Sequence, residues 1–157
     1  MTEPRPTAPV TGSLFRPHTE DLLQLARDAI EHGLHHRGYL PLDLADFHPD
    51  LHQVRSAFVT LRRGGDLRGC IGSVEAHRPL VEEVARNAHG AAFNDPRFPA
   101  LTREEWPGLD LSIEILSPAE TVPFESEEDL LARLEPGSDG LILEAGRATG
   151  IEVRNGT

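Results

Sequence analysis

Several residue types are scarce in this sequence, and each scarcity excludes something. Its 157 residues include one cysteine, so no disulfide can form within the chain and stability does not depend on an oxidising compartment. No apolar run approaches the roughly 18 residues that a membrane-spanning helix needs. The stretch from Met1 to Pro9 lacks the pattern of a secretory signal. We therefore expect a cytoplasmic protein with no membrane partner.

Positive charge is scarce as well. The 15 basic residues are all arginine, they face 26 acidic residues, and the formal net charge is -11. Binding to a nucleic-acid backbone needs clustered cations, so this balance argues against a nucleic-acid partner. The acidic excess is concentrated after residue 100, and any surface that binds a small anionic ligand is expected in the first two thirds of the chain. No glycine-rich phosphate loop is present.

Hydrophobic periodicity predicts helices mixed with strands that hairpins connect. One helix is expected from Thr19, which would cap it, to Gly33 or Gly38, and a second begins at Pro79 and ends near Phe93. Thr102 and Glu105 form a capping box. A further helix is expected over residues 126–134, and strands over residues 56–63, 67–74, 109–115, 141–144 and 151–153. This order favours an α+β domain, with antiparallel sheets and flanking helices, over a doubly wound parallel sheet.

The N-terminal residues differ in composition from the rest. Residues 1–13 are rich in proline and small polar residues and have little to bury, which predicts a disordered N-terminal tail. Residues 14–157 are long enough for one domain with a substantial core. We therefore expect a single domain that follows a short disordered segment.

The chain's only cysteine lies in the second strand of the predicted hairpin. The stretch reads Leu67-Arg68-Gly69-Cys70-Ile71-Gly72. Two glycines in a strand indicate a bulge, a strained turn, or the close approach of a ligand or another backbone. With a side-chain period of two, Arg68 and Cys70 would share one face, and Leu67 and Ile71 would share the opposite, buried face. Gly72 would leave space beside the thiol.

The role of Cys70 has several readings at this point. It fits a small buried hydrophobe, a thiolate nucleophile or ligand favoured by the charge of Arg68, or a neighbour of an arginine that binds a carboxylate or phosphate. Asp95, Arg97 and Glu114 are possible companions. Asp95 also fits a turn residue before a proline, and Glu114 also fits an exposed strand position.

A cysteine hydrolase or acyltransferase would need a base, usually histidine, and none of the eight histidines has a motif-like position. The spacings within His32, His35 and His36, and between His48 and His52, resemble metal-binding spacings. No HExxH motif or Cys/His cluster supports them. We therefore expect neither a metal site nor a cofactor.

Several segments together resemble the AMMECR1 domain. They are the hexapeptide Leu67–Gly72, Pro79-Leu80, Asn87, residues 91–99, the strand end at residues 113–117, and residues 137–141. The hexapeptide equals the signature of that family, and the other segments have its order and spacing from about Leu22 to Leu143. In bacteria and archaea this domain is known as protein A of the AmmeMemoRadiSam system. That system also has a Memo-like protein, related to extradiol dioxygenases, and a radical SAM protein.

The resemblance implies two unequal α+β lobes with a groove between them, but no defined reaction. The expected groove residues are Leu67, Arg68, Gly69, Cys70, Ile71, Gly72, Asp95, Arg97 and Glu114. A binding or accessory component acting with the Memo-like and radical SAM proteins is favoured. The alternative is an enzyme that acts on a small anionic substrate through Cys70 and Arg68. The family continues past the Gly140-Leu141 strand into a Thr-Phe-Leu-Pro segment and a helix with Trp-Glu. This chain instead runs through residues 146–150 into Ile151, so we expect a truncated or altered C-terminal part.

Overall fold

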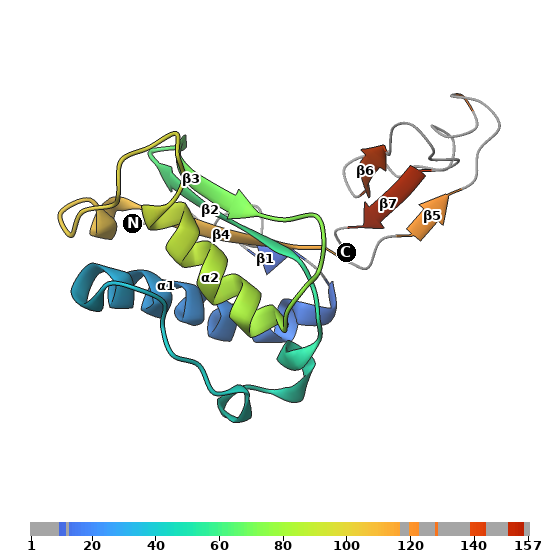
Figure 1. Ribbon diagram of the computed structural model, residues 1–157, viewed down its shortest axis with the longest axis horizontal. Helices are drawn as coiled ribbons and strands as arrows, with labels where there is room; N and C mark the ends of the chain where they lie inside the picture. Colours follow the sequence, from blue (N-terminus) through green and yellow to red (C-terminus); the bar gives the residue numbers. More distant parts are fainter. Residues whose placement is uncertain are drawn as a thin grey trace, which may run out of the picture.

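The structure is a computed structural model, and it describes residues 10–11, 13–116, 120–122, 128, 139–143 and 151–155. Its principal elements are β1 (Val10–Thr11), α1 (Thr19–His36), β2 (Ala57–Arg63), β3 (Asp66–Gly72), α2 (Leu80–Phe93), β4 (Asp110–Ile115), β5 (Glu120–Val122), β6 (Asp139–Leu143) and β7 (Ile151–Asn155). Four short 3-10 helices accompany them: η1 (Ser13–His18), η2 (Leu44–Asp46), η3 (Pro49–His52) and η4 (Trp106–Gly108). Figure 1 shows both α-helices on one side of the sheet that contains β2, β3 and β4.

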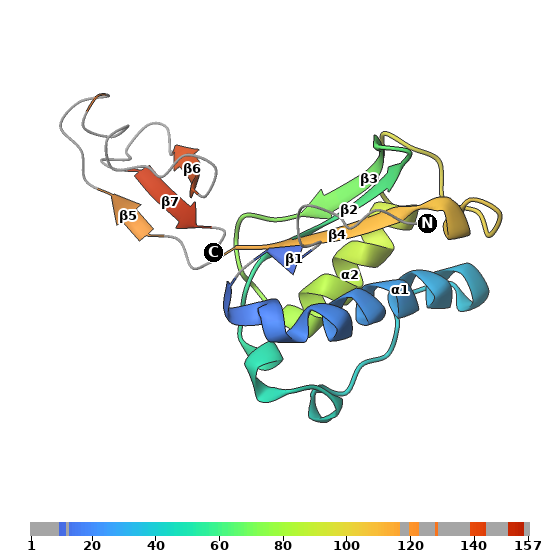
Figure 2. The same ribbon diagram turned by 180° about the vertical axis from the view of Figure 1, so that it is seen from behind.

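The larger sheet has four strands in the order β1-β4-β2-β3. Strand β2 pairs antiparallel with both β3 and β4, as the hairpin pattern predicted. The view from behind in Figure 2 also places α1 and α2 on one face of this sheet. Strands β5, β7 and β6 form a separate three-stranded antiparallel sheet. The predicted α+β class is therefore confirmed.

The N-terminal segment departs from the expected disordered tail at Val10–Thr11. These two residues form β1, which pairs parallel with Ile113 and Glu114 of β4. Backbone pairing needs no apolar side chains, which is why the polar composition of this segment gave no sign of it. The other residues expected to form the tail, apart from Ser13 at the start of η1, lie outside the described residues, and so does most of the helix expected over residues 126–134.

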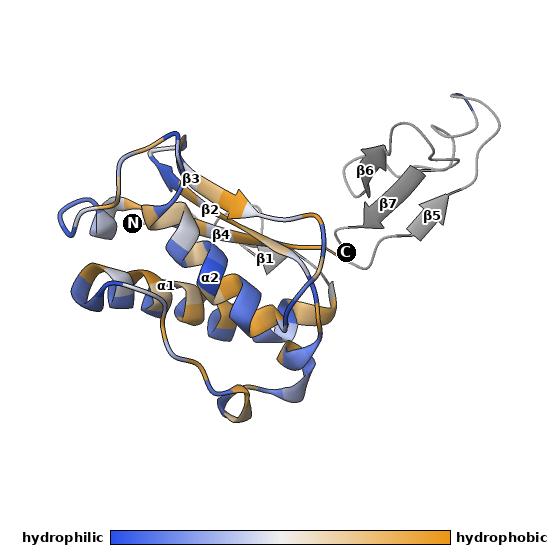
Figure 3. Cartoon of the chain, viewed as in Figure 1, coloured by the Kyte–Doolittle hydropathy of each residue, from blue (hydrophilic) through white to orange (hydrophobic). Residues whose placement is uncertain are grey.

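The core lies between the two helices and the sheet. Alternate residues of β2 and β4 point into it, because side chains along a strand alternate between the two faces. The fully or almost fully buried members on these strands are Ala57, Val59, Leu61, Leu111, Ile113 and Ile115. Figure 3 shows hydrophobic residues along these strands and polar residues on the outer turns of the helices. Burial of a large aliphatic side chain contributes about 1.5–3 kcal/mol, so these strand residues add substantially to the stability of the core.

Helix α2 is built to lie close to the sheet. Its buried face carries small residues: Ala85, Ala88, Gly90, Ala91 and Ala92. Small side chains let the helix backbone approach the strands, and the consequence for β3 is described below. Among the described residues, neither this helix nor α1 is both long and apolar enough to cross a membrane.

The expected helix ends are confirmed in part. Helix α1 ends where Arg37 and Gly38 have positive backbone φ angles, of 56° and 85°. Its N-cap is His18, however, and the hydroxyl of Thr19 donates to the carbonyl of Arg16 at 2.9 Å. The prediction that Thr19 caps this helix was therefore wrong, because the preceding 3-10 turn already extends to His18.

Candidate functional site

The hexapeptide forms β3, which lies at one edge of the four-stranded sheet. Its two glycines have separate packing reasons. A Cβ atom on Gly69 would overlap the carbonyl oxygen of Ala91, so the backbone of α2 passes directly against this strand. A Cβ atom on Gly72 would overlap the ring of Phe58. Close approach of another backbone therefore explains Gly69. The expectation that Gly72 leaves open space was wrong, because Phe58 occupies it.

A bulge interrupts the side-chain alternation of β3. Gly69 pairs with Leu61 and Leu67 pairs with Arg62, so Arg68 is left without a partner on β2. Opposed residues on neighbouring strands point to the same face. Leu67 therefore lies on the face of Arg62, whereas Ile71 lies on the helix-covered face. The expected pairing of Leu67 with Ile71 on one buried face was wrong, since the extra residue reverses the alternation.

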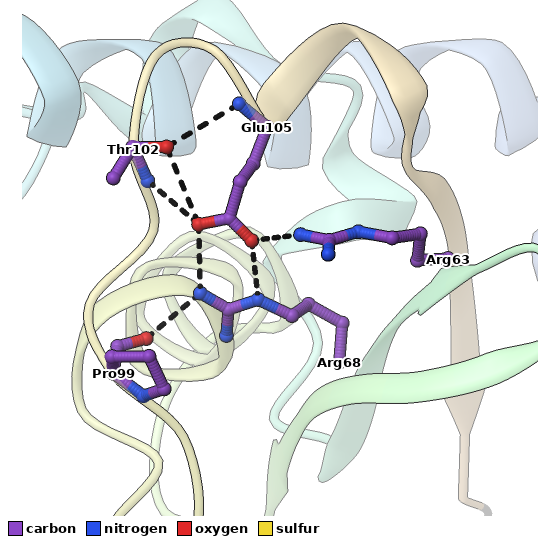
Figure 4. A network of polar contacts seen from close by, with 5 residues as sticks. All are labelled: Arg63, Arg68, Pro99, Thr102 and Glu105. Atoms are coloured by element: carbon purple, nitrogen blue, oxygen red, sulfur yellow. Dashed lines mark hydrogen bonds and ion pairs between the residues drawn. The ribbon is translucent and has the colours of Figure 1, made fainter.

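Arg68 is a buried residue with its side chain 8% exposed, and it forms a two-pronged ion pair with Glu105. Its Nε donates to Glu105 Oε2 at 2.8 Å and its Nη2 donates to Glu105 Oε1 at 3.2 Å. Nη2 also donates to the carbonyl oxygen of Pro99 at 2.8 Å, and the ring of Phe98 lies 5.8 Å from the guanidinium carbon. Figure 4 shows Arg68 reaching from β3 to the loop that carries these partners. The arginine fork that a substrate anion would need is thus occupied by a carboxylate.

Glu105 is the centre of this network, and the sequence gave it only a capping role. It does form the predicted capping box. The carboxylate of Glu105 accepts a hydrogen bond from the backbone amide of Thr102 at 3.2 Å, and the backbone amide of Glu105 donates to the hydroxyl of Thr102 at 3.4 Å. Its Oε2 also contacts Arg63, whose side chain is 56% exposed. The hydrogen bond from Arg68 is the main reason that the pKa of Glu105 falls to about 2. Glu105 is therefore ionised at neutral pH, and it fixes the loop before β4 onto β3.

Asp95 is buried and fixes the outer edge of β3. Its Oδ2 accepts hydrogen bonds from the backbone amide of Cys70 at 3.0 Å and from Nη2 of Arg97 at 2.7 Å. Its Oδ1 accepts a hydrogen bond from Nε of Arg97 at 3.0 Å. Arg97 also reaches the carbonyl oxygen of Cys70 at 3.4 Å. These bonds, chiefly those from Arg97, hold the pKa of Asp95 well below its usual range. The pair therefore satisfies the backbone N–H and carbonyl of Cys70, which an edge strand would otherwise expose.

Cys70 itself is half-buried and lies opposite Thr60 on the face of the sheet away from the helices. The hydroxyl of Thr60 donates to its Sγ at 3.3 Å. Within residues 13–116, no histidine or carboxylate makes a hydrogen bond to this sulfur. A thiol nucleophile normally has such a base beside it, so the described surroundings of Cys70 do not form a nucleophile–base pair.

The expected companions of Cys70 separate into two groups. The structure brings Asp95 and Arg97 to its backbone, as described above. Glu114 is exposed on β4 opposite Phe58, so it shares the open face with Cys70 but is separated from β3 by β2. The residues that sequence reasoning missed are Thr60, one strand across, and Glu105 as an ion-pair partner. Only the capping-box pattern drew attention to Glu105.

Fold and site together define a class of protein. It is an α+β domain whose glycine-containing edge strand is fixed by two arginine–carboxylate pairs and presents a half-buried thiol. The family model described as AMMECR1 matches residues 23–152, and the chain belongs to the AMMECR1 family. The resemblance found in the sequence is therefore confirmed.

Archaeal proteins of known sequence show the same relationship. A protein of Methanothermobacter thermautotrophicus is 42% identical over 139 residues, which cover 88% of this chain and 71% of that protein. A protein of Sulfolobus acidocaldarius is 37% identical, with 81% of this chain and 57% of that protein covered. The crystal structure of the uncharacterised protein PH0010 from Pyrococcus horikoshii is similar with a TM-score of 0.73 and 36% identity, covering 84% of this chain and 66% of that one. The chain thus spans between 57% and 71% of the length of these three relatives.

Proposed function

We propose that this domain is a binding or accessory component, which presents the β3 edge and the open face of its sheet to a Memo-like protein and a radical SAM protein. The observation that supports this best is the pairing of both arginines near the thiol. Arg68 is held by Glu105 and Arg97 by Asp95, each through two nitrogen–oxygen contacts. Most donor groups of these two guanidinium groups are used within the domain, which leaves little of either one for a substrate anion.

The open face has the properties of a recognition surface. Phe58, Thr60 and Cys70 are half-buried on it, and Glu114 is exposed. No described helix covers this face (Figures 1 and 2). A partly apolar centre with a charged residue at its side is the usual composition of a protein interface. The expected groove between two unequal lobes is part of the same proposal.

Co-purification of the full chain with its Memo-like and radical SAM partners tests this proposal. We expect Glu114→Arg to weaken binding by about tenfold or more, because it reverses a charge on the open face. Glu20→Arg is the matched control: Glu20 is exposed on α1, on the opposite side of the sheet, and the change in net charge is the same. The proposal would be refuted if the wild type bound neither partner, or if the Glu114 variant bound both as well as the control.

An enzyme acting through Cys70 and Arg68 is the second candidate, and one observation favours it. Nη1 of Arg68 is buried and has no hydrogen-bond partner among the described residues, although the rest of the guanidinium is fully used. The variants Cys70→Ser and Cys70→Ala separate the two candidates. If both variants fold, bind the partners and sustain the pathway like the wild type, the thiol performs no chemistry.

A further inference from the structure

Two histidines and an aspartate from distant parts of the chain meet beside η3. His18 ends η1 and is buried, whereas His48 and Asp50 flank Pro49 on a later turn. Nε2 of His18 lies 3.1 Å from Oδ2 of Asp50, and Nδ1 of His48 lies 3.5 Å from the same oxygen. One nitrogen or oxygen from each residue lies within 4.8 Å of the others. No other group of three histidine, cysteine or acidic side chains within the described residues comes together in this way.

We propose that His18, His48 and Asp50 form a binding site for a divalent transition-metal ion, with Zn²⁺ the best match. Two imidazoles and one carboxylate are a common ligand set for catalytic zinc and for non-haem iron. Bonds of about 2.0–2.1 Å in a tetrahedral arrangement place neighbouring ligand atoms about 3.3 Å apart. The separations of 3.1 and 3.5 Å to Asp50 already agree with that spacing. All three ligand atoms lie within 4.8 Å of one another, so the site is completed when the two imidazole nitrogens close to this spacing and an ion replaces the hydrogen bond between His18 and Asp50.

The surroundings of the three residues fit an ion that keeps an open coordination position. The side chain of His18 is only 11% exposed, which fixes one ligand, while those of His48 and Asp50 are 55% and 44% exposed. Solvent can therefore supply the remaining ligand. Nδ1 of His48 accepts a hydrogen bond from the backbone amide of Asp50 at 3.1 Å. A metal ion bound to this nitrogen would replace that hydrogen bond.

An acidic cavity adjoins the cluster and supplies a second, independent reason to expect a cation. Its volume is about 390 Å³, and it lies between α1 and the segment that follows this helix, with His48 in its wall. Four aspartates line it: Asp21, Asp28, Asp43 and Asp46. Carboxylates gathered in one concave surface raise the local concentration of cations. His48 links this cavity to the three-residue cluster.

The histidine pairs noticed in the sequence do not form such a site. Nε2 of His52 bonds to the carbonyl oxygens of Leu44 at 2.6 Å and Phe47 at 3.1 Å, so His52 stabilises the loop and does not join His48. The rings of His32 and His36 on α1 lie with centroids 4.8 Å apart and tilted by 36°, but no described carboxylate completes a set of three with them. These two residues supply a control, since paired histidines one helical turn apart are the obvious competing site.

Zinc titration of the full chain against a chromophoric chelator tests the site. We expect one Zn²⁺ ion per chain. His48→Ala and Asp50→Asn should each weaken binding at least about tenfold, which is the loss commonly seen when even a supporting residue of a metal site is removed. Both changes affect partly exposed side chains, so the variants should fold. His36→Ala should bind as the wild type does.

Two further measurements keep the outcome unambiguous. Zn²⁺ should raise the melting temperature of the wild type and of His36→Ala but not that of His48→Ala, because an ion that binds only the folded state stabilises it. Co²⁺ in place of Zn²⁺ should give visible absorption bands that Asp50→Asn alters. Equal zinc affinity of the wild type and His48→Ala, or loss of binding in His36→Ala, would overturn the proposal.

Discussion

Replacement of Gly69 by alanine is the most direct test of how the hexapeptide is packed. A Cβ atom at this position would overlap the carbonyl oxygen of Ala91 and lie 3.0 Å from its carbonyl carbon. Both atoms belong to the backbone of α2, and a helix backbone cannot move aside as a side chain can. The strand and the helix would have to separate, and the core between them would open.

The expected cost follows from two opposing effects. Overpacking a well-packed contact costs about 1–3 kcal/mol, and a clash with helix backbone lies at the upper end of that range. Alanine also restricts the unfolded chain more than glycine does, which returns about 0.4–1 kcal/mol. We therefore expect Gly69→Ala to lower the free energy of unfolding by about 2 kcal/mol. For a chain of this length, that corresponds to a decrease of about 4–8 °C in the melting temperature.

Urea and thermal unfolding followed by circular dichroism measure this loss, and two other glycines are matched controls. A Cβ atom on Gly108 meets nothing within 4 Å, so Gly108→Ala should be neutral or slightly stabilising. A Cβ atom on Gly90 would meet the Ile71 side chain at 3.1 Å, a contact that a small movement of that side chain relieves. Alanine also favours the helix more than glycine does, so Gly90→Ala should cost less stability than Gly69→Ala. If Gly69→Ala were as stable as Gly108→Ala, the close approach of α2 to β3 would be refuted.

Three further predictions concern the charged groups. Arg68→Ala should destabilise the protein by at least about 1.5 kcal/mol more than Arg63→Ala in urea unfolding, because Arg68 is buried with Glu105 and Arg63 is mostly exposed; equal losses would contradict this. The lowered pKa values of Glu105 and Asp95 mean that both stabilise the fold when ionised. The Glu105 contribution should be lost as the pH falls from about 4.5 to about 2, and Glu105→Gln should flatten this part of the curve of unfolding free energy against pH. Burial lowers the pKa of His89, so protonation favours the unfolded state; stability should decline below pH 6.5, and His89→Phe should reduce that slope.

The helices and strands of the four-stranded sheet could be predicted because their signals are local. Alternation over residues 109–115 predicted β4, and the segment that begins at Pro79 predicted α2, to within a residue or two at each end. Strand β1 had no such signal, since two residues carry no period. Its position depends on the backbone groups that the edge of β4 offers, which no local pattern reveals.

The site was predicted less well, because its geometry depends on one inserted residue and on contacts between distant segments. The predicted alternation of side chains assumed that every residue of β3 has a partner on β2. Arg68 has none, so the alternation reverses at the bulge. Two glycines had indicated a bulge as one alternative, but they could not locate it. The capping box already accounted for Glu105, so the sequence gave no reason to expect that its carboxylate also binds an arginine 37 positions earlier.

The structure assigns a packing or bonding role to most residues of the hexapeptide, so few of them are left to serve a function other than folding. Gly69 admits the backbone of α2, Gly72 admits the ring of Phe58, and Arg68 holds the loop through Glu105. These roles would require the same residue types in a protein with no activity at all. The thiol of Cys70 is different, because its backbone is fixed by Asp95 while its sulfur accepts a single bond from Thr60, which a serine hydroxyl could also accept. If Cys70→Ser keeps the stability of the wild type but loses its activity or partner binding, the loss therefore reflects recognition or chemistry and not folding.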